Sequence, residues 1–217
     1  MGFFGVFLYN LCFFTGLRTV PAGRASLMAA LQPSVIFLFA TVVWGERATG
    51  LKIAGLTISL FGAFLVLSQA DPMRLFESGV NSGDLWVLGC VASWVAYTLI
   101  GRSMAGHFPV IAATAYSTWL GTALLIGFGA FHPAASPVWS SKVWLATVFL
   151  GVFGTAVAFL FYLQGLRQIG ASRASIFVNL VPVFGVIFSS VVLGESLSGA
   201  TFVGGACVIV GVRLLNR

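Results

Sequence analysis

The stretch GLRTVPAGRAS at residues 16–26 returns as GLRQIGASRAS at residues 165–175. The likeness continues without a gap through residues 66 and 215, so that arginines, prolines and glycine–glutamate pairs fall in register. Unrelated apolar segments would share leucines and valines, but not these residue types at a constant offset. The sequence therefore predicts an internal duplication.

The composition of the chain excludes a water-soluble globule. Of the 217 residues, 59% are hydrophobic and 7% are charged, and the mean hydropathy is +1.04. So few ionisable groups cannot cover the surface of a soluble protein of this length, and a lipid bilayer is the expected environment. The net charge of +6 is spread singly or in pairs over short loops, which does not indicate a nucleic-acid partner.

Long apolar runs predict helices that span the membrane, because about 20 helical residues cross a hydrocarbon core of roughly 30 Å. The runs are continuous rather than alternating, which favours helices over the strands of a barrel. The predicted class is an all-α polytopic membrane protein with eight transmembrane helices. These spans are expected at residues 2–17, 22–44, 50–69, 84–103, 109–131, 142–165, 171–193 and 198–215.

The polar stretch at residues 69–84 has the turn chemistry of a connector. We expect a first unit of three helices at residues 1–69, a connector at 70–83 and a second unit of five helices at 84–217. The first and sixth spans correspond by the duplication and are an odd number of spans apart, so the two repeats should be inverted. Residues 84–140 have no counterpart in the first unit, so the first two helices of a five-helix plan are expected to be missing from it.

The basic residues predict the orientation of the chain in the membrane. Counted on alternating sides of the spans, seven of the eleven Lys and Arg residues fall on one side and four on the other. The positive-inside rule then places the carboxyl terminus in the cytoplasm. The larger set comprises Arg47, Lys52, Arg102, Arg167, Arg173, Arg213 and Arg217.

Both units share a set of four features: the arginine-bearing junction, a proline within the next helix, a Gly-Glu stop and a glycine-spaced last helix. The stop reads VVWGERATG at residues 42–50 and VVLGESLSG at residues 191–199. This set resembles the EamA type of the drug/metabolite transporter superfamily over essentially the whole chain. The resemblance implies ten helices in two inverted repeats and export of small metabolites or amino acids through a bacterial inner membrane. This chain departs from that plan by lacking the first two helices.

Two prolines stand about halfway along matching spans, Pro33 in residues 22–44 and Pro182 in residues 171–193. A proline has no amide hydrogen to donate to the carbonyl four residues back, so both helices should kink near the middle of the membrane. One interpretation is a symmetric pair of hinges, or a cavity wall, in alternating access. The other is a kink that serves packing alone.

Two amides lie beside these prolines, Gln32 and Asn179. Because polar side chains are costly in lipid, both should face the protein interior. The repeat aligns Gln32 with Val181 and Asn179 with Ala30, so the two amides are not equivalent. They predict either an asymmetric substrate cavity or interhelical hydrogen bonds alone.

Aromatic residues follow a helical stripe in the fourth span, where Trp94 and Tyr97 recur with Cys90 and Gly101. Tyr9 and Tyr162 lie on corresponding faces of the first and sixth spans. Rings that carry one polar atom suit a pocket for an amphipathic or aromatic solute. Aromatic residues near span ends are better explained as anchors at the membrane surface, and these are Trp44, Trp86, Trp139 and Trp144.

The spans show no facing carboxylates, no metal-ligand spacing and no nucleophile paired with a base, so no catalytic residue, metal or cofactor is expected. All five acidic residues fall at helix ends or in loops, which leaves no proton carrier in mid-membrane and favours facilitated export or exchange. We therefore predict a secondary transporter for a small-molecule solute, with an inactive or structural membrane fragment as the alternative. Matched glycines predict a close helix contact within the chain or across a homodimer; they are Gly55, Gly62, Gly204 and Gly211.

Overall fold

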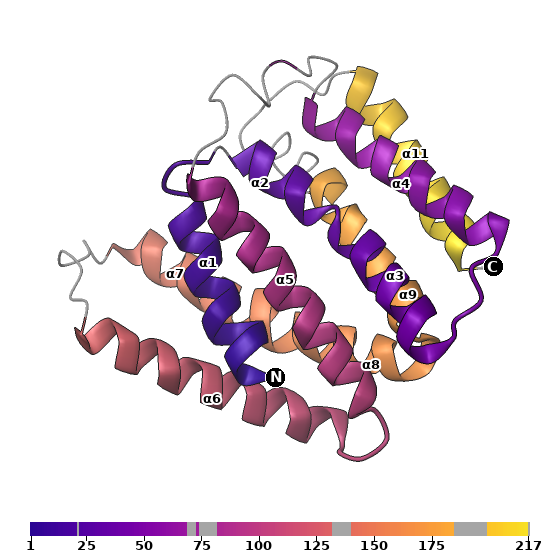
Figure 1. The fold of residues 1–217 in the computed structure, drawn as a ribbon. Helices are drawn as coiled ribbons and strands as arrows, with labels where there is room; N and C mark the ends of the chain where they lie inside the picture. Colours follow the sequence, from indigo (N-terminus) through magenta and orange to yellow (C-terminus); the bar gives the residue numbers. More distant parts are fainter. Residues whose placement is uncertain (21, 69–72, 74–81, 132–139, 185–198, 217) are drawn as a thin grey trace.

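The computed structural model describes the chain except for residues 21, 69–72, 74–81, 132–139, 185–198 and 217. The described residues form helices joined by short turns and contain no β-strand (Figure 1). In chain order the elements are η1 (Phe3–Leu8), α1 (Tyr9–Gly16), α2 (Ala22–Ala29), α3 (Gln32–Trp44), α4 (Gly50–Ser68), α5 (Ser82–Ser103), α6 (Val110–Phe131), α7 (Ser141–Phe149), η3 (Leu150–Val157), α8 (Ala158–Ile169), α9 (Ala171–Ser175), η4 (Ile176–Asn179) and α11 (Gly199–Leu215).

Three described helices are long and apolar enough to cross a membrane on their own: α5, α6 and the continuous helix Ser141–Ile169. The last of these joins α7, the π-helical turns of η3 and α8. Shorter apolar helices account for the other expected spans, at Phe3–Gly16, Gln32–Trp44, Gly50–Val66, Ala171–Phe184 and Gly199–Leu215. The predicted all-α membrane class is confirmed. The expected span at 22–44 is divided between α2 and α3, and the end of the span expected at 171–193 lies outside the described residues.

Both proline-bearing spans are interrupted near their prolines. In the first, α2 ends at Ala29 and α3 begins at Gln32, with Pro33 in its first turn. Proline suits that position because the first turn of a helix has no internal partner for its amide hydrogens. In the second, the 3₁₀ turns of η4 precede Pro182. The α-helix is thus interrupted before Pro33 and gives way to 3₁₀ turns before Pro182, whereas a bend at these points and a role of the prolines as hinges stay predictions.

The Gly-Glu stop ends α3 as expected. Gly45 adopts φ = +62°, a left-handed conformation that glycine tolerates without strain, and the Glu46 amide donates to the Ala40 carbonyl at 3.2 Å. Thr49 then caps α4, since its hydroxyl accepts from the Lys52 amide at 3.4 Å. The matching stop at Gly194 and Glu195 lies outside the described residues.

The four matched glycines bring α4 and α11 together within the chain, and the two helices lie side by side (Figure 1). A Cβ added to Gly55 would lie 2.8 Å from the Gly211 carbonyl oxygen, and one added to Gly62 would lie 2.5 Å from that of Gly204. The duplication pairs Gly55 with Gly204 and Gly62 with Gly211, so each glycine contacts the equivalent of the other. A two-fold axis between the units would produce this reciprocal contact. The inversion of the repeats in a membrane stays a prediction.

The buried apolar residues form a larger cluster around α5 and a second one between α4 and α11. The first cluster draws on η1, α3, α8 and α9 as well, and it contains Tyr97 and Leu166, neither of which has exposed surface. Large apolar side chains remain exposed on the outside, as expected where lipid is the surrounding medium. Trp86 and Trp144 are among them, whereas Trp139 lies outside the described residues.

Candidate functional site

A cavity of about 550 Å³ lies between helices from both units. Tyr9 of α1 and Gln32 of α3 line it from the first unit, and Trp94 of α5 and Tyr162 of α8 line it from the second. These are four of the six residues that the sequence predicted to bind substrate. The remaining described lining consists of Gly154, Ala158, Phe159, Phe161, Gly165, Ile169, Ala174, Phe177, Val178 and Val181.

Trp94 is the centre of the aromatic lining. Its ring centroid lies 5.0 Å from that of Tyr162, 5.4 Å from Tyr9 and 5.5 Å from Phe159. These separations are typical of tilted and edge-to-face pairs, which hold rings in fixed mutual orientations. The cluster therefore presents a fixed aromatic wall to the cavity.

Tyr162 is fixed by a second helix. Its hydroxyl and that of Thr98 are 2.8 Å apart and share a hydrogen bond. Thr98 is four residues beyond Trp94 on α5, so one face of that helix positions both the indole and the phenol. The sequence analysis missed Thr98 and Phe159, although their spacing from Trp94 and Tyr162 could have indicated them.

Tyr97 does not line the cavity. Its side chain is fully buried, its ring packs 5.3 Å from both Trp94 and Phe159, and its other side contacts Gly5 of η1. A Cβ on Gly5 would clash with this ring. Tyr97 therefore supports the aromatic wall from behind, and a contact between Tyr97 and solute is not what this arrangement favours.

The two predicted amides have different environments. Asn179 is fully buried, its side-chain amide donates to the Ser59 hydroxyl at 3.0 Å, and it is absent from the described lining. It ties η4 to α4, as the hydrogen-bonding interpretation expected. Gln32 lines the cavity and is 2% exposed, and its Nε2 has no hydrogen-bond partner among the described residues. The polar asymmetry of the cavity thus comes from Gln32.

A charged hydrogen bond joins the two helices α5 and α8 at one end of the cavity wall. The Arg102 guanidinium donates to the Leu166 carbonyl at 3.1 Å and so links the last turns of α5 and α8. A cation near the C-terminus of a helix interacts favourably with its unpaired carbonyls. Arg102 therefore fixes α8, the segment that carries Tyr162, against α5.

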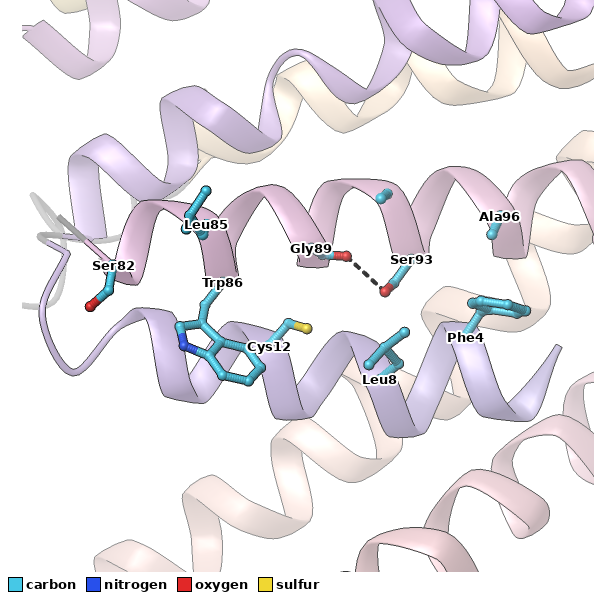
Figure 2. A pocket seen from close by; sticks show the side chains of 10 residues that line it. Phe4, Leu8, Cys12, Ser82, Leu85, Trp86, Gly89, Ser93 and Ala96 are labelled. Carbon is cyan, nitrogen blue, oxygen red and sulfur yellow. Dashed lines mark hydrogen bonds between the residues drawn. The ribbon is translucent and has the colours of Figure 1, made fainter. Parts of the chain in front are cut away.

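A larger groove of about 760 Å³ lies along the continuous helix of η1 and α1 and the helix α5 beside it (Figure 2). Its lining is almost wholly apolar, and Leu85 and Trp86 at one end of it are exposed to the outside. The Ser93 hydroxyl donates to the Gly89 carbonyl of its own helix at 2.7 Å, so its proton is already used within α5 (Figure 2). A site needs a few convergent polar groups to select a solute, and the smaller cavity has them.

No group of three His, Cys, Asp or Glu side chains among the described residues is placed to hold a metal ion. Cys12 and Cys90 are buried as free thiols, and Cys207 is partly buried.

The chain belongs to the EamA-like transporter family, whose model matches residues 1–68 and 81–217. It is therefore an integral membrane protein of a transporter family, and this membership points to transport rather than catalysis.

Relatives with names support that class. An uncharacterized transporter of Bacillus subtilis (strain 168), YyaM, is 29% identical over 216 residues, which cover 98% of this chain and 70% of the relative. A probable terminal-alkyne amino-acid exporter of Streptantibioticus cattleyicolor is 28% identical over 98% of this chain and 70% of its own length. The aromatic amino acid exporter YddG of Ancylobacter novellus is 27% identical over 98% of this chain and 73% of its own length.

The fold has also been seen in a solved structure. A crystal structure matches this chain with a TM-score of 0.79 and 25% identity, over 99% of this chain and 73% of the other. The chain thus spans about 70% of the length of the proteins it resembles.

Proposed function

We propose that the protein is a secondary transporter that exports a small metabolite or amino acid through the bacterial inner membrane by alternating access. The observation that supports this most directly is the cavity between the two units, lined by Tyr9, Gln32, Trp94 and Tyr162. Transporters built from repeats place their substrate at the interface of the repeats. Two relatives named as amino-acid exporters agree with the direction of transport.

The interrupted spans supply the movement in this proposal. The regular α-helix is already broken at both places, between Ala29 and Gln32 and at the 3₁₀ turns of η4, so bending there costs less than bending an intact helix. The glycine contact between α4 and α11 brings two backbones together and resists separation. Pro33 and Pro182 therefore act as hinges, and the α4–α11 pair acts as the fixed support.

No carboxylate lies in the middle of a described span, since Glu46 and Asp84 lie at helix ends. The described residues thus offer no group that would carry a proton across the membrane. We propose facilitated export or exchange down the gradient of the solute.

Flux in reconstituted vesicles tests the function. The chain is inserted into lipid vesicles loaded with one unlabelled solute from a panel of amino acids and uncharged aromatic metabolites. Uptake of the same solute in radiolabelled form by exchange is compared with protein-free vesicles and with Trp94→Ala. Uptake above both controls is expected for at least one solute of the panel. Absence of exchange for every solute of the panel would contradict the proposal.

A second interpretation is an inactive or structural membrane subunit. It is favoured by one observation. The helix Ser141–Ile169 contains α8, which forms a wall of the cavity, but its other two parts, α7 and η3, contain no buried residue. Exchange by YddG of Ancylobacter novellus, reconstituted in separate vesicles, is measured in parallel with exchange by this chain to distinguish the two interpretations. Exchange by the relative with none by the chain would favour the structural role.

Site-directed labelling tests the predicted orientation. Arg18 and Arg167 occupy matching junctions of the two units, so cysteines placed there should react with an impermeant maleimide from opposite sides of the membrane. The Arg167 side is expected to be cytoplasmic, together with the carboxyl terminus. Reaction of both from one side would rule out inverted repeats.

A further inference from the structure

The cavity combines an aromatic wall with two buried donors that have no hydrogen-bond partner among the described residues, the Gln32 amide nitrogen and the Trp94 indole nitrogen. Gln32 is 2% exposed, lines the cavity, and has an Nε2 without a hydrogen-bond partner among the described residues. A buried amide without a partner is unfavourable, and native structures rarely leave one so unless a ligand or water completes it. The geometry of the site therefore favours a ligand that brings a hydrogen-bond acceptor to this nitrogen.

No residue of the described lining carries a full charge. The fourteen lining residues include Tyr9, Trp94, Tyr162 and Gln32, but no Asp, Glu, Lys, Arg or His. An ammonium or carboxylate brought to this depth would lose its hydration without gaining a counter-charge, which costs far more than one neutral hydrogen bond returns. A zwitterionic amino acid would carry both of these unpaired charges into the cavity.

We infer that the solute is an uncharged aromatic compound whose ring packs on Trp94 and Tyr162 and whose carbonyl or hydroxyl oxygen accepts a hydrogen bond from Gln32 Nε2. This inference rests on the proposed function, because it takes the cavity to be the solute site, and it narrows the solute to one charge class. Stacking on the aromatic wall supplies affinity for the solute, and this affinity depends little on which aromatic ring the solute carries. Gln32 sets the specificity for an acceptor.

A matched set of probes separates the charge classes on one ring: phenylacetamide is neutral with an acceptor, phenylacetate is an anion, and phenethylamine is a cation. Binding of each radiolabelled compound to the full chain in lipid nanodiscs is measured by equilibrium dialysis at neutral pH, with empty nanodiscs as the blank. Phenylacetamide is expected to bind at least about tenfold more tightly than either ion, because an unpaired buried charge is penalised by more than the 1.4 kcal/mol that a tenfold change represents.

Three variants assign the specificity to Gln32. Gln32→Leu removes the donor at similar volume and should weaken phenylacetamide about fivefold to tenfold, the usual effect of one neutral hydrogen bond. Gln32→Glu should shift the preference toward phenethylamine, because it supplies the missing counter-charge. Thr41→Val, on the same helix but outside the lining, removes a hydroxyl that bonds only to the Phe37 carbonyl and should leave all three affinities unchanged.

Failure of the inference and failure of the proposed function give different results. Equal or tighter binding of either ion, unchanged binding in Gln32→Leu, or no saturable binding of any probe would overturn the inference. If vesicles exchange amino acids and phenylacetamide does not compete, transport stands and the inference fails. If phenylacetamide binds through Gln32 and no solute is exchanged, the binding site stands and the transport proposal fails.

Discussion

The helices Phe3–Gly16 and Ser141–Ile169 occupy matching positions in the two units, yet they differ in how the described chain encloses them. In the first, Gly2 contacts the Ser117 carbonyl of α6 and Gly5 contacts the Tyr97 ring of α5. In the second, a Cβ added to Gly151 would meet nothing within 4 Å, and one added to Gly154 would meet only Leu150 of its own helix. The matching glycines therefore serve close packing in one helix and are open in the other.

This contrast shows that a repeated sequence pattern does not determine burial. Glycines at the same spacing allow close approach, but whether a neighbour approaches depends on the helices packed alongside. Within Ser141–Ile169 the difference continues along the helix: Leu166 of α8 is fully buried against the core, whereas Leu145 of α7 is 73% exposed. The α8 part of this helix therefore contributes buried residues to the core, whereas α7 contributes none.

The largest expected effect separates those two ends. Leu166→Ala should destabilise the protein by about 2–5 kcal/mol, because it leaves a cavity in a packed core. Leu145→Ala at the exposed end should change stability by less than about 0.5 kcal/mol. Thermal unfolding in detergent micelles measures both. Equal shifts would mean that α7 is packed as tightly as α8.

Matched glycine substitutions test the contrast between the two helices directly. Gly5→Leu forces a side chain into the Tyr97 ring and should cost about 1–3 kcal/mol or more. Gly154→Leu adds the same side chain at the open matching position and should cost little. The comparison uses the unfolding temperatures of the two variants. A larger loss in Gly154→Leu would show that this face is covered in the membrane.

Arg102→Met weakens the anchor of α8 while keeping an apolar stem. Loss of the bond to the Leu166 carbonyl should cost about 1 kcal/mol, since Arg102 is partly exposed and its charge is partly screened. Hydrogen exchange near the end of α8 should accelerate, with exchange in α4 as the internal control. Unchanged protection would show that packing alone fixes α8.

The smallest effect concerns the π-helical turns. The Thr155 hydroxyl donates to the Leu150 carbonyl at 3.3 Å, whereas the matching residue in the first unit is Val6. Thr155→Val makes the two units alike at this position and should cost about 0.5 kcal/mol. The unfolding temperature should fall by no more than about 2 °C. A larger fall would mean that this hydroxyl is needed to keep the π-helical turns.

Sequence reasoning predicted the spans, the proline breaks and the α3 stop because each depends on local chemistry. It also named Tyr9, Gln32, Trp94 and Tyr162 as candidates to bind a solute, and these four residues line one cavity in the structure. The spacing could not show that Tyr97 and Trp94 face different neighbours. Three residues turn a helix by about 300°, so the two side chains point only about 60° apart and belong to one stripe.

The place of Asn179 depended on a residue far away in the chain. Its partner, Ser59, is 120 positions distant, and nothing in the local sequence of either residue indicates the other. Polarity alone predicted that Asn179 is buried. Which of two interior environments it enters is decided by how α4 packs against η4, a tertiary property.

Gln32 opens α3 directly after the break, while Trp94 lies well inside the unbroken helix α5. In the proposed hinge at Pro33, Gln32 lies next to the pivot, so a bend there would turn its amide relative to the indole of the unbroken helix. A solute held between the two would lose its hydrogen bond to Gln32 when the helix bends, so that release would follow from the bend itself.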